Sequence, residues 1–211
     1  MGCLNEVTVG IDFGHGEINP DTLKYVTKGK KSPIWPDGSR YYEGVGNKKI
    51  GIYVIKGLEK LGINYELTRP IDDWRDTPLK KRKSKINKAS KKNKKMFSIS
   101  IHSNGSSKQQ AHGAEVWTWP GQSPSDPMAT IWMEEHIKMF PELTIRKDTS
   151  DGDLDKESKF TMNSVDCPSF LIETMFHTNR KECKILASKE GKKKIAQGII
   201  NAIVRIIKEL Y

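Results

Sequence analysis

Three strand-like runs of apolar residues in this chain each lead to a side chain suited to metal or proton chemistry. Two of these runs stop on His15 and His102, and the third stops on Glu173. In an open α/β sheet the carboxyl ends of the strands lie along one edge, and ligands bind there. We therefore expect the two histidines and the glutamate to share one site.

Strand-like and helix-like segments alternate along the rest of the chain. Helical spacing of apolar residues recurs over residues 50–61, 79–93, 128–140 and 195–210, and strand-like runs occupy residues 65–68 and 113–119. Residues 17–46 and 149–159 are expected to be loops, and Thr77 and Pro78 are expected to be the N-cap and first residue of a helix. The alternation predicts an α/β fold with helices on both faces of the sheet.

The net charge of +10 comes from one segment. Residues 79–95 hold ten Lys or Arg and no acidic residue, so the remaining residues sum to zero. We expect a basic helix with a thin apolar face that includes Leu79, and it would attract polyanions. The lysines expected to form this patch are Lys80, Lys81, Lys83, Lys88, Lys91 and Lys92.

Cysteine usage and the first residues bear on the compartment. Cys3, Cys167 and Cys183 form no CxxC pair, which indicates reduced thiols rather than a disulfide framework. The first residues lack a basic start followed by an apolar stretch, and no run is long enough to span a bilayer. We expect synthesis in the cytoplasm without a signal peptide, and a monomer.

The two histidines have the surroundings of metal ligands. Glycines flank His15, and small polar residues share the strand face of His102. Zinc commonly takes three protein ligands, and two histidines with one carboxylate is a known set. The third ligand should lie after His15: Asp21 and Asp37 are candidates, and Glu43 is favoured because it precedes a helix, where the helix dipole stabilises a carboxylate.

Glu173 emerges from an apolar strand, where a carboxylate needs a partner. The matching role is a general base and then a general acid. The remaining histidines are expected to be peripheral: His112 and His136 at the surface, and His177 behind the site or at the surface.

With these candidate residues, the chain resembles the type-3 family of zinc-dependent N-acetylmuramoyl-L-alanine amidases, which cut peptidoglycan between the lactyl group of muramic acid and L-alanine. The matching segments occur in the family's order at residues 11–16, 43–47, 100–104, 113–115 and 168–179. The resemblance implies a mixed, mostly parallel sheet sandwiched between helices in three layers (α/β/α). It implies one Zn²⁺ ion held by His15, Glu43 and His102, with Glu173 as the catalytic residue.

The resemblance also implies the setting and the partners. We expect residues 1–211 to form a single amidase catalytic domain, endolysin-like and without a separate wall-binding domain. It would act on the cell wall after release through a phage-encoded membrane lesion, and export by an unusual route is the alternative. Peptidoglycan is the expected substrate. The basic helix, rather than the resemblance, suggests anionic envelope polymers as a second partner, and a solvated helix face is the alternative. Substrate contacts are expected from Asn104, Glu115, Trp117 and Trp35.

Two other functions remain open from the sequence. A carboxypeptidase-like zinc peptidase would need an arginine near the site, and Arg69 or Arg180 could serve. A nucleic-acid-binding protein could use the basic helix, although a segment that is nearly all lysine lacks the arginines and aromatic residues that contact bases.

Overall fold

The computed structural model describes residues 4–150 and 152–211, so the expectation for Cys3 lies outside the described residues. Six strands form one sheet in the order β2-β1-β3-β6-β4-β5. The strands are β1 (Thr8–Phe13), β2 (Asn64–Leu67), β3 (Met96–Asn104), β4 (Glu115–Thr118), β5 (Lys156–Glu157) and β6 (Ser169–Phe176). All neighbouring pairs are parallel except β4 with β6. The predicted mixed, mostly parallel sheet is confirmed.

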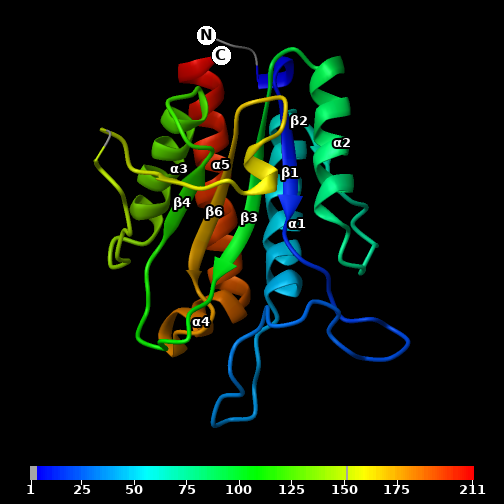
Figure 1. Cartoon of the computed structure of the whole chain (residues 1–211), viewed down its shortest axis with the longest axis vertical. Coiled ribbons are helices and arrows are strands. Elements are labelled where there is room, and N and C mark those ends of the chain that lie inside the picture. Colours follow the sequence, from blue (N-terminus) through cyan, green and yellow to red (C-terminus); the bar gives the residue numbers. More distant parts are fainter. Residues whose placement is uncertain (1–3, 151) are drawn as a thin grey trace.

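Five α-helices lie in the described residues, together with two short 3-10 helices. Their bounds are α1 (Glu43–Leu61), α2 (Leu79–Lys92), α3 (Ser125–Met139), α4 (Arg180–Ala187), α5 (Lys189–Leu210), η1 (Leu4–Glu6) and η2 (Thr161–Asn163). Figure 1 shows α5 behind the sheet between α1 and α3, with η2 in front of the sheet. None of these helices is both long and apolar enough to span a lipid bilayer.

The two faces of the sheet are covered unequally. Helices α1, α3 and α5 pack their apolar stripes on one face and enclose the main core. On the other face α2 and η2 enclose a small cluster that includes Ile86, Ala89 and Met162. On this face β3 carries Ser98, Ser100 and His102, as its alternation predicted. The carboxyl ends of β1, β3 and β6 meet at one edge because these strands are parallel.

Several boundaries differ from the sequence prediction. β3 and β6 continue beyond His102 and Glu173, so neither residue ends its strand. Helix α1 begins at Glu43 rather than after it, which shortens the predicted loop. The acidic segment predicted as loop contains β5, and α4 was not predicted.

Helix α2 also departs from expectation at its first turn. Pro78 is the N-cap rather than the first helical residue, and its carbonyl accepts from Lys81 and Arg82. Leu79 is 45% exposed, whereas Arg82 is buried at 4% exposure. The prediction that Leu79 belongs to the buried apolar face was therefore wrong. In this first turn the buried side chain is Arg82, which forms an ion pair with Asp12.

Candidate functional site

The segment after β1 turns sharply to present His15. His15 has φ of 69°, a left-handed conformation that non-glycine residues rarely adopt. Arg69 holds this turn, because its Nη2 donates to the His15 carbonyl at 3.0 Å. A methyl group on Gly14 would lie 2.0 Å from His102 Cε1, so glycine is required there for the second imidazole to fit.

The long loop after His15 folds back and delivers Glu43 to the same place. Its two arms pair at an isolated bridge between Lys31 and Tyr42, and the Glu43 N–H donates to the Lys30 carbonyl at 3.0 Å. Helix α1 starts there and packs so closely that a methyl group on Gly44 would lie 1.9 Å from the Gly16 carbonyl oxygen. Glu43 therefore stands in the first turn of α1, buried, beside the His15 turn.

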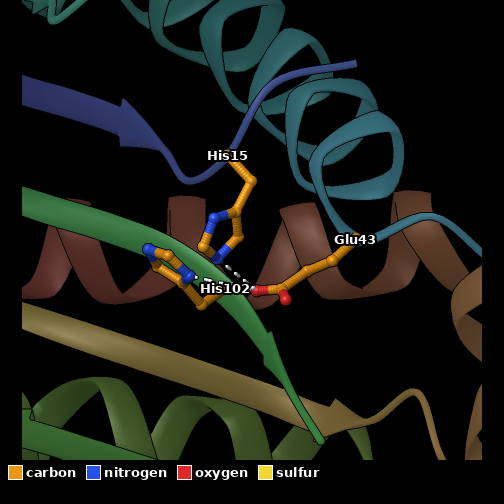
Figure 2. A group of neighbouring side chains, drawn as sticks. All are labelled: His15, Glu43 and His102. Atoms are coloured by element: carbon orange, nitrogen blue, oxygen red, sulfur yellow. Dashed lines mark hydrogen bonds and ion pairs between the residues drawn. The ribbon is translucent and has the colours of Figure 1, made fainter. Parts of the chain in front are cut away.

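His15, Glu43 and His102 point toward one another from the turn after β1, from α1 and from β3 (Figure 2). Glu43 Oε1 lies 3.3 Å from His15 Nε2 and 3.0 Å from His102 Nδ1. One ligand atom from each residue falls within 4.8 Å of the others. Glu43 Oε2 is buried without a hydrogen-bond partner, so the cluster has spare acceptor capacity. This donor set of two imidazole nitrogens and one carboxylate fits a metal ion such as zinc.

Of the three candidates for the third ligand, only Glu43 meets the histidines. Asp21 is exposed in a turn of the long loop. Asp37 hydrogen-bonds Ser39 and pairs with Arg180. The geometry thus favours Glu43 over Asp21 and Asp37 as the third ligand.

Burial and mutual contact set the charge states in the cluster. Burial opposes the charge of Glu43, but hydrogen bonds and charges from His102 and His15 hold the pKa of its carboxyl well below the usual range. Burial lowers the pKa of His102, and Glu43 offsets this only in part. An ionised carboxylate beside an imidazole that favours its neutral form is the protonation state that metal ligands need.

A buried polar network lies beneath the cluster on the α2 side of the sheet. Asp12 accepts hydrogen bonds from Thr68 at 2.6 Å and from Ser100 at 2.5 Å, and its Oδ2 lies 2.8 Å from Arg82 Nη1. Burial would raise the pKa of Asp12, but Arg82 and the two hydroxyls lower it overall. This network, which the sequence analysis missed, fixes α2 to the strand that leads to His15.

A pocket of about 490 Å³ opens beside the cluster. Its polar lining includes His15, Lys30, His102 and Glu173, and its apolar lining includes Leu79, Phe160, Met162 and Leu171. Lys30 and the segment around Phe160 were not predicted to contribute, because both lie in irregular chain far from the motifs. Such a mixed lining is typical of a site that binds an amphipathic substrate.

Glu173 lies in register with His102 on β3 and with Glu115 on β4. Cross-strand partners in register project to the same face of a sheet, so the catalytic candidate faces the pocket beside a histidine of the cluster. Burial raises the pKa of Glu173 well above the usual range, and the charges of Glu43 and Glu115 add to this. Its Oε2 has no hydrogen-bond partner.

The four residues predicted to contact the substrate differ in their surroundings. Asn104 Nδ2 donates to Glu115 Oε2 at 3.1 Å, and Glu115 is buried and paired with Arg146 and Lys156. Trp117 packs edge-on against Phe160, which lines the pocket. The structure does not bring Trp35 to the pocket.

Trp35 is only 6% exposed, stacks under Arg180 and donates from Nε1 to Cys183 Sγ at 3.3 Å. It therefore anchors the tip of the long loop to α4 and does not line the pocket beside the cluster. Both partners belong to α4, an element that the sequence analysis did not anticipate.

The other histidines divide between surface and interior. His112 is exposed, as predicted. His136 is completely buried, so its predicted surface position was wrong. His177 is buried, stacks on Tyr41 and contacts Ser103, the neighbour of His102.

Neither arginine required by the carboxypeptidase alternative lines the pocket. Arg69 is buried against Phe13, where it holds the His15 carbonyl and Glu17. Arg180 pairs with Asp37 over Trp35. Arg82 does line the pocket, but Asp12 neutralises its charge.

The fold and the cluster together define an α/β protein with a candidate metal centre at the carboxyl edge of its sheet. Residues 9–205 match the family of N-acetylmuramoyl-L-alanine amidases. This chain belongs to that family, and it is a peptidoglycan amidase by membership; the resemblance found in the sequence is confirmed.

Individual relatives agree with this assignment. A protein of Buchnera aphidicola, provisionally described as an N-acetylmuramoyl-L-alanine amidase, is 29% identical over 92% of each chain. The amidase of Clostridium difficile 630 has 22% identity and a TM-score of 0.76, over 98% of this chain and 100% of the other. The CwlV catalytic domain of Bacillus (Paenibacillus) polymyxa var. colistinus has 24% identity and a TM-score of 0.72, over 95% and 98%. These two likenesses establish the shared fold.

Proposed function

We propose that this chain is a zinc-dependent hydrolase of the amide bond between the lactyl group of N-acetylmuramic acid and L-alanine. His15, Glu43 and His102 would hold one Zn²⁺ ion, and Glu173 would carry the proton. The observation that supports this most is the convergence of three metal-binding atoms within 4.8 Å, beside a pocket that Glu173 also lines. When bound there, zinc would polarise the scissile carbonyl and make a water molecule more acidic.

The chain's own residues supply the remaining chemistry. Glu173 Oε2, which lacks a partner, would take the proton of the attacking water and pass it to the amide nitrogen as the bond breaks. The raised pKa of Glu173 suits a group that must hold a proton between these two transfers. Lys30, which also lines the pocket, offsets this rise in the pKa of Glu173 only in part.

We also propose an endolysin-like single catalytic domain that is made in the cytoplasm and acts on the wall after release through a membrane lesion. The catalytic domain of the CD27L endolysin, with 20% identity and a TM-score of 0.65, supports the architecture. The family match over residues 9–205 supports one catalytic domain across the described fold.

Digestion of purified peptidoglycan, with mass spectrometry of the products, tests the reaction. Intact protein should release stem peptides with a free L-alanine amine, chelation should abolish the release, and Zn²⁺ should restore it. Glu173→Gln should keep the bound zinc and lose about 10²–10⁴-fold in rate, since general acid–base catalysis contributes about that much.

Glu190→Gln, an exposed glutamate in the first turn of α5, is the matched control and should retain the full rate. Cleavage at another bond, or full activity of the metal-free protein, would overturn the proposal. Normal turnover of Glu173→Gln would remove that residue from its proposed role.

A further inference from the structure

Helix α2 turns most of its lysines outward. Its buried side chains are Arg82, Ile86 and Ala89, which lie on the sheet side. The exposed lysines form what we term the lysine face: Lys80, Lys81, Lys85, Lys88, Lys91 and Lys92. A shallow groove of about 410 Å³ runs along part of this face. Lys83 does not belong to it, since it is half-buried and donates to Ser164 Oγ at 2.9 Å.

The charge of the lysine face is not compensated within the described residues. Of residues 79–95, only Arg82 and Lys95 form ion pairs there, with Asp12 and Glu6. Like charges one helical turn apart destabilise a helix by a few tenths of a kcal/mol per pair. A bound polyanion would relieve this repulsion, so the surface is complementary to a chain of negative charges.

The lysine face and the pocket meet in the first turn of α2. Pro78, Leu79 and Arg82 line the pocket, and Lys80 follows directly. Arg82 is fixed to Asp12 on β1, three residues before His15, so the face has a set position relative to the cluster. A helix of 14 residues is about 21 Å long. A polymer lying along α2 would therefore lead toward the pocket.

We propose that the lysine face binds an anionic phosphodiester polymer of the bacterial envelope, attached to the glycan that the pocket receives. This inference rests on the proposed peptidoglycan hydrolysis. Lysine ammonium groups are compact point charges that accept phosphates in many orientations, which suits a flexible polymer. Nucleic acid is disfavoured because the face has no arginine and no aromatic side chain to contact a base.

The test compares two quadruple variants with the same loss of charge. The first replaces four lysines of the face by glutamine: Lys81, Lys85, Lys88 and Lys92. The matched control replaces four exposed lysines of α4 and α5: Lys184, Lys189, Lys193 and Lys208. Binding to purified poly(glycerol phosphate) is measured by calorimetry at 50 and 200 mM salt, with a DNA duplex of equal phosphate concentration as the competing probe.

The lysine-face variant should bind the polymer at least about tenfold more weakly than the control at 50 mM salt, with a shallower salt dependence, because fewer counterions are released. The control should stay within about twofold of the unaltered protein, as expected for charges distant from the polymer. Equal losses in both variants, unchanged binding in the first, or tighter binding of the duplex than of the polymer would each overturn the proposal.

Cleavage of polymer-free peptidoglycan by the unaltered protein and the control is measured in parallel. No cleavage in that assay would remove the proposed function, whatever the polymer does. Cleavage together with equal binding losses would remove only the role of the lysine face.

Discussion

His136 is a titratable side chain held entirely inside the protein. Its ring packs between Trp132 and Phe140, and Nε2 donates to the Thr174 carbonyl at 3.0 Å. Burial lowers the pKa of the imidazole to about 4, and the backbone hydrogen bond offsets this only in part. The folded protein therefore resists a proton that the unfolded chain accepts near pH 6.5.

The consequence for stability follows from the sign of this shift. The contribution of His136 is fully present above pH 6.5 and is lost as the pH falls toward 4, by about 3 kcal/mol. His136→Gln should flatten the fall in unfolding free energy over that interval, measured by urea denaturation of metal-free protein. His112→Gln, an exposed control, should keep the original slope. Parallel curves for all three proteins would contradict this account.

His136 was predicted to lie at the surface because histidine is a polar residue type, although its position in the helix indicates otherwise. Trp132 lies four residues earlier in the same helix and Phe140 lies four residues later at its C-cap, so all three rings lie on one side. That side is the apolar one. The helical spacing therefore indicates that His136 is buried, and the prediction was wrong because it assumed that a lone histidine lies at the surface.

At the scale of elements, the start of α1 depends on close contact between backbones. A methyl group on Gly44 would meet the Gly16 carbonyl oxygen at 1.9 Å, and this backbone belongs to the His15 turn. Glycine is ordinarily unfavourable in a helix by about 0.5–1 kcal/mol relative to alanine. Here it permits the contact that sets Glu43 against His15.

Gly44→Ala should therefore destabilise the protein by about 1–3 kcal/mol, although alanine has a higher helix propensity than glycine, and it should weaken metal binding. Gly198→Ala in α5 is the control, since the added methyl group would meet the flexible Met139 side chain at 3.2 Å and backbone atoms only at the ordinary contact distance of 3.9 Å. Urea denaturation and metal titration of both variants measure the effect. Equal behaviour of the two variants would show that the close contact at Gly44 is unimportant.

The strands and most helices could be predicted because alternation and helical spacing are local signals. The predicted ends of helices and strands were wrong where tertiary contacts determine them. Glycines at the start of α1 suggested a loop, whereas close contacts of Gly44 with the Gly16 carbonyl and of Gly46 with the Tyr41 hydroxyl require them in the helix. Helix α4 has only eight residues, and its signal was Asn179, whose side chain caps the N–H groups of Lys181 and Glu182.

At the scale of the whole molecule, the site joins distant segments. His15, Glu43 and His102 come from the turn after β1, the first turn of α1 and β3. Their residue types and motif context could be read from the sequence. The pairing of Asp12 with Arg82 could not, because it joins residues 70 positions apart without a local pattern.

Binding of an ion across these segments should stabilise the entire fold. Zinc at 100 times its dissociation constant adds about 2.7 kcal/mol, or roughly 5–10 °C in Tm for a chain of this size. Glu43→Gln should lose most of this shift in thermal unfolding. Asp21→Asn, which alters a ligand candidate that lies away from the cluster, should keep it. A shift that survives Glu43→Gln and disappears with Asp21→Asn would reassign the third ligand.

The position of the chain ends has a practical consequence. η1 packs against α5 and β2, and the Tyr211 hydroxyl donates to the carbonyl of Met96, the first residue of β3. Both ends of the fold thus lie at the amino edge of the sheet, opposite the pocket (Figure 1). A fluorescent protein or an affinity module fused at either end would project away from the glycan. A short linker joining the two ends would permit circular permutation without crossing the substrate's path.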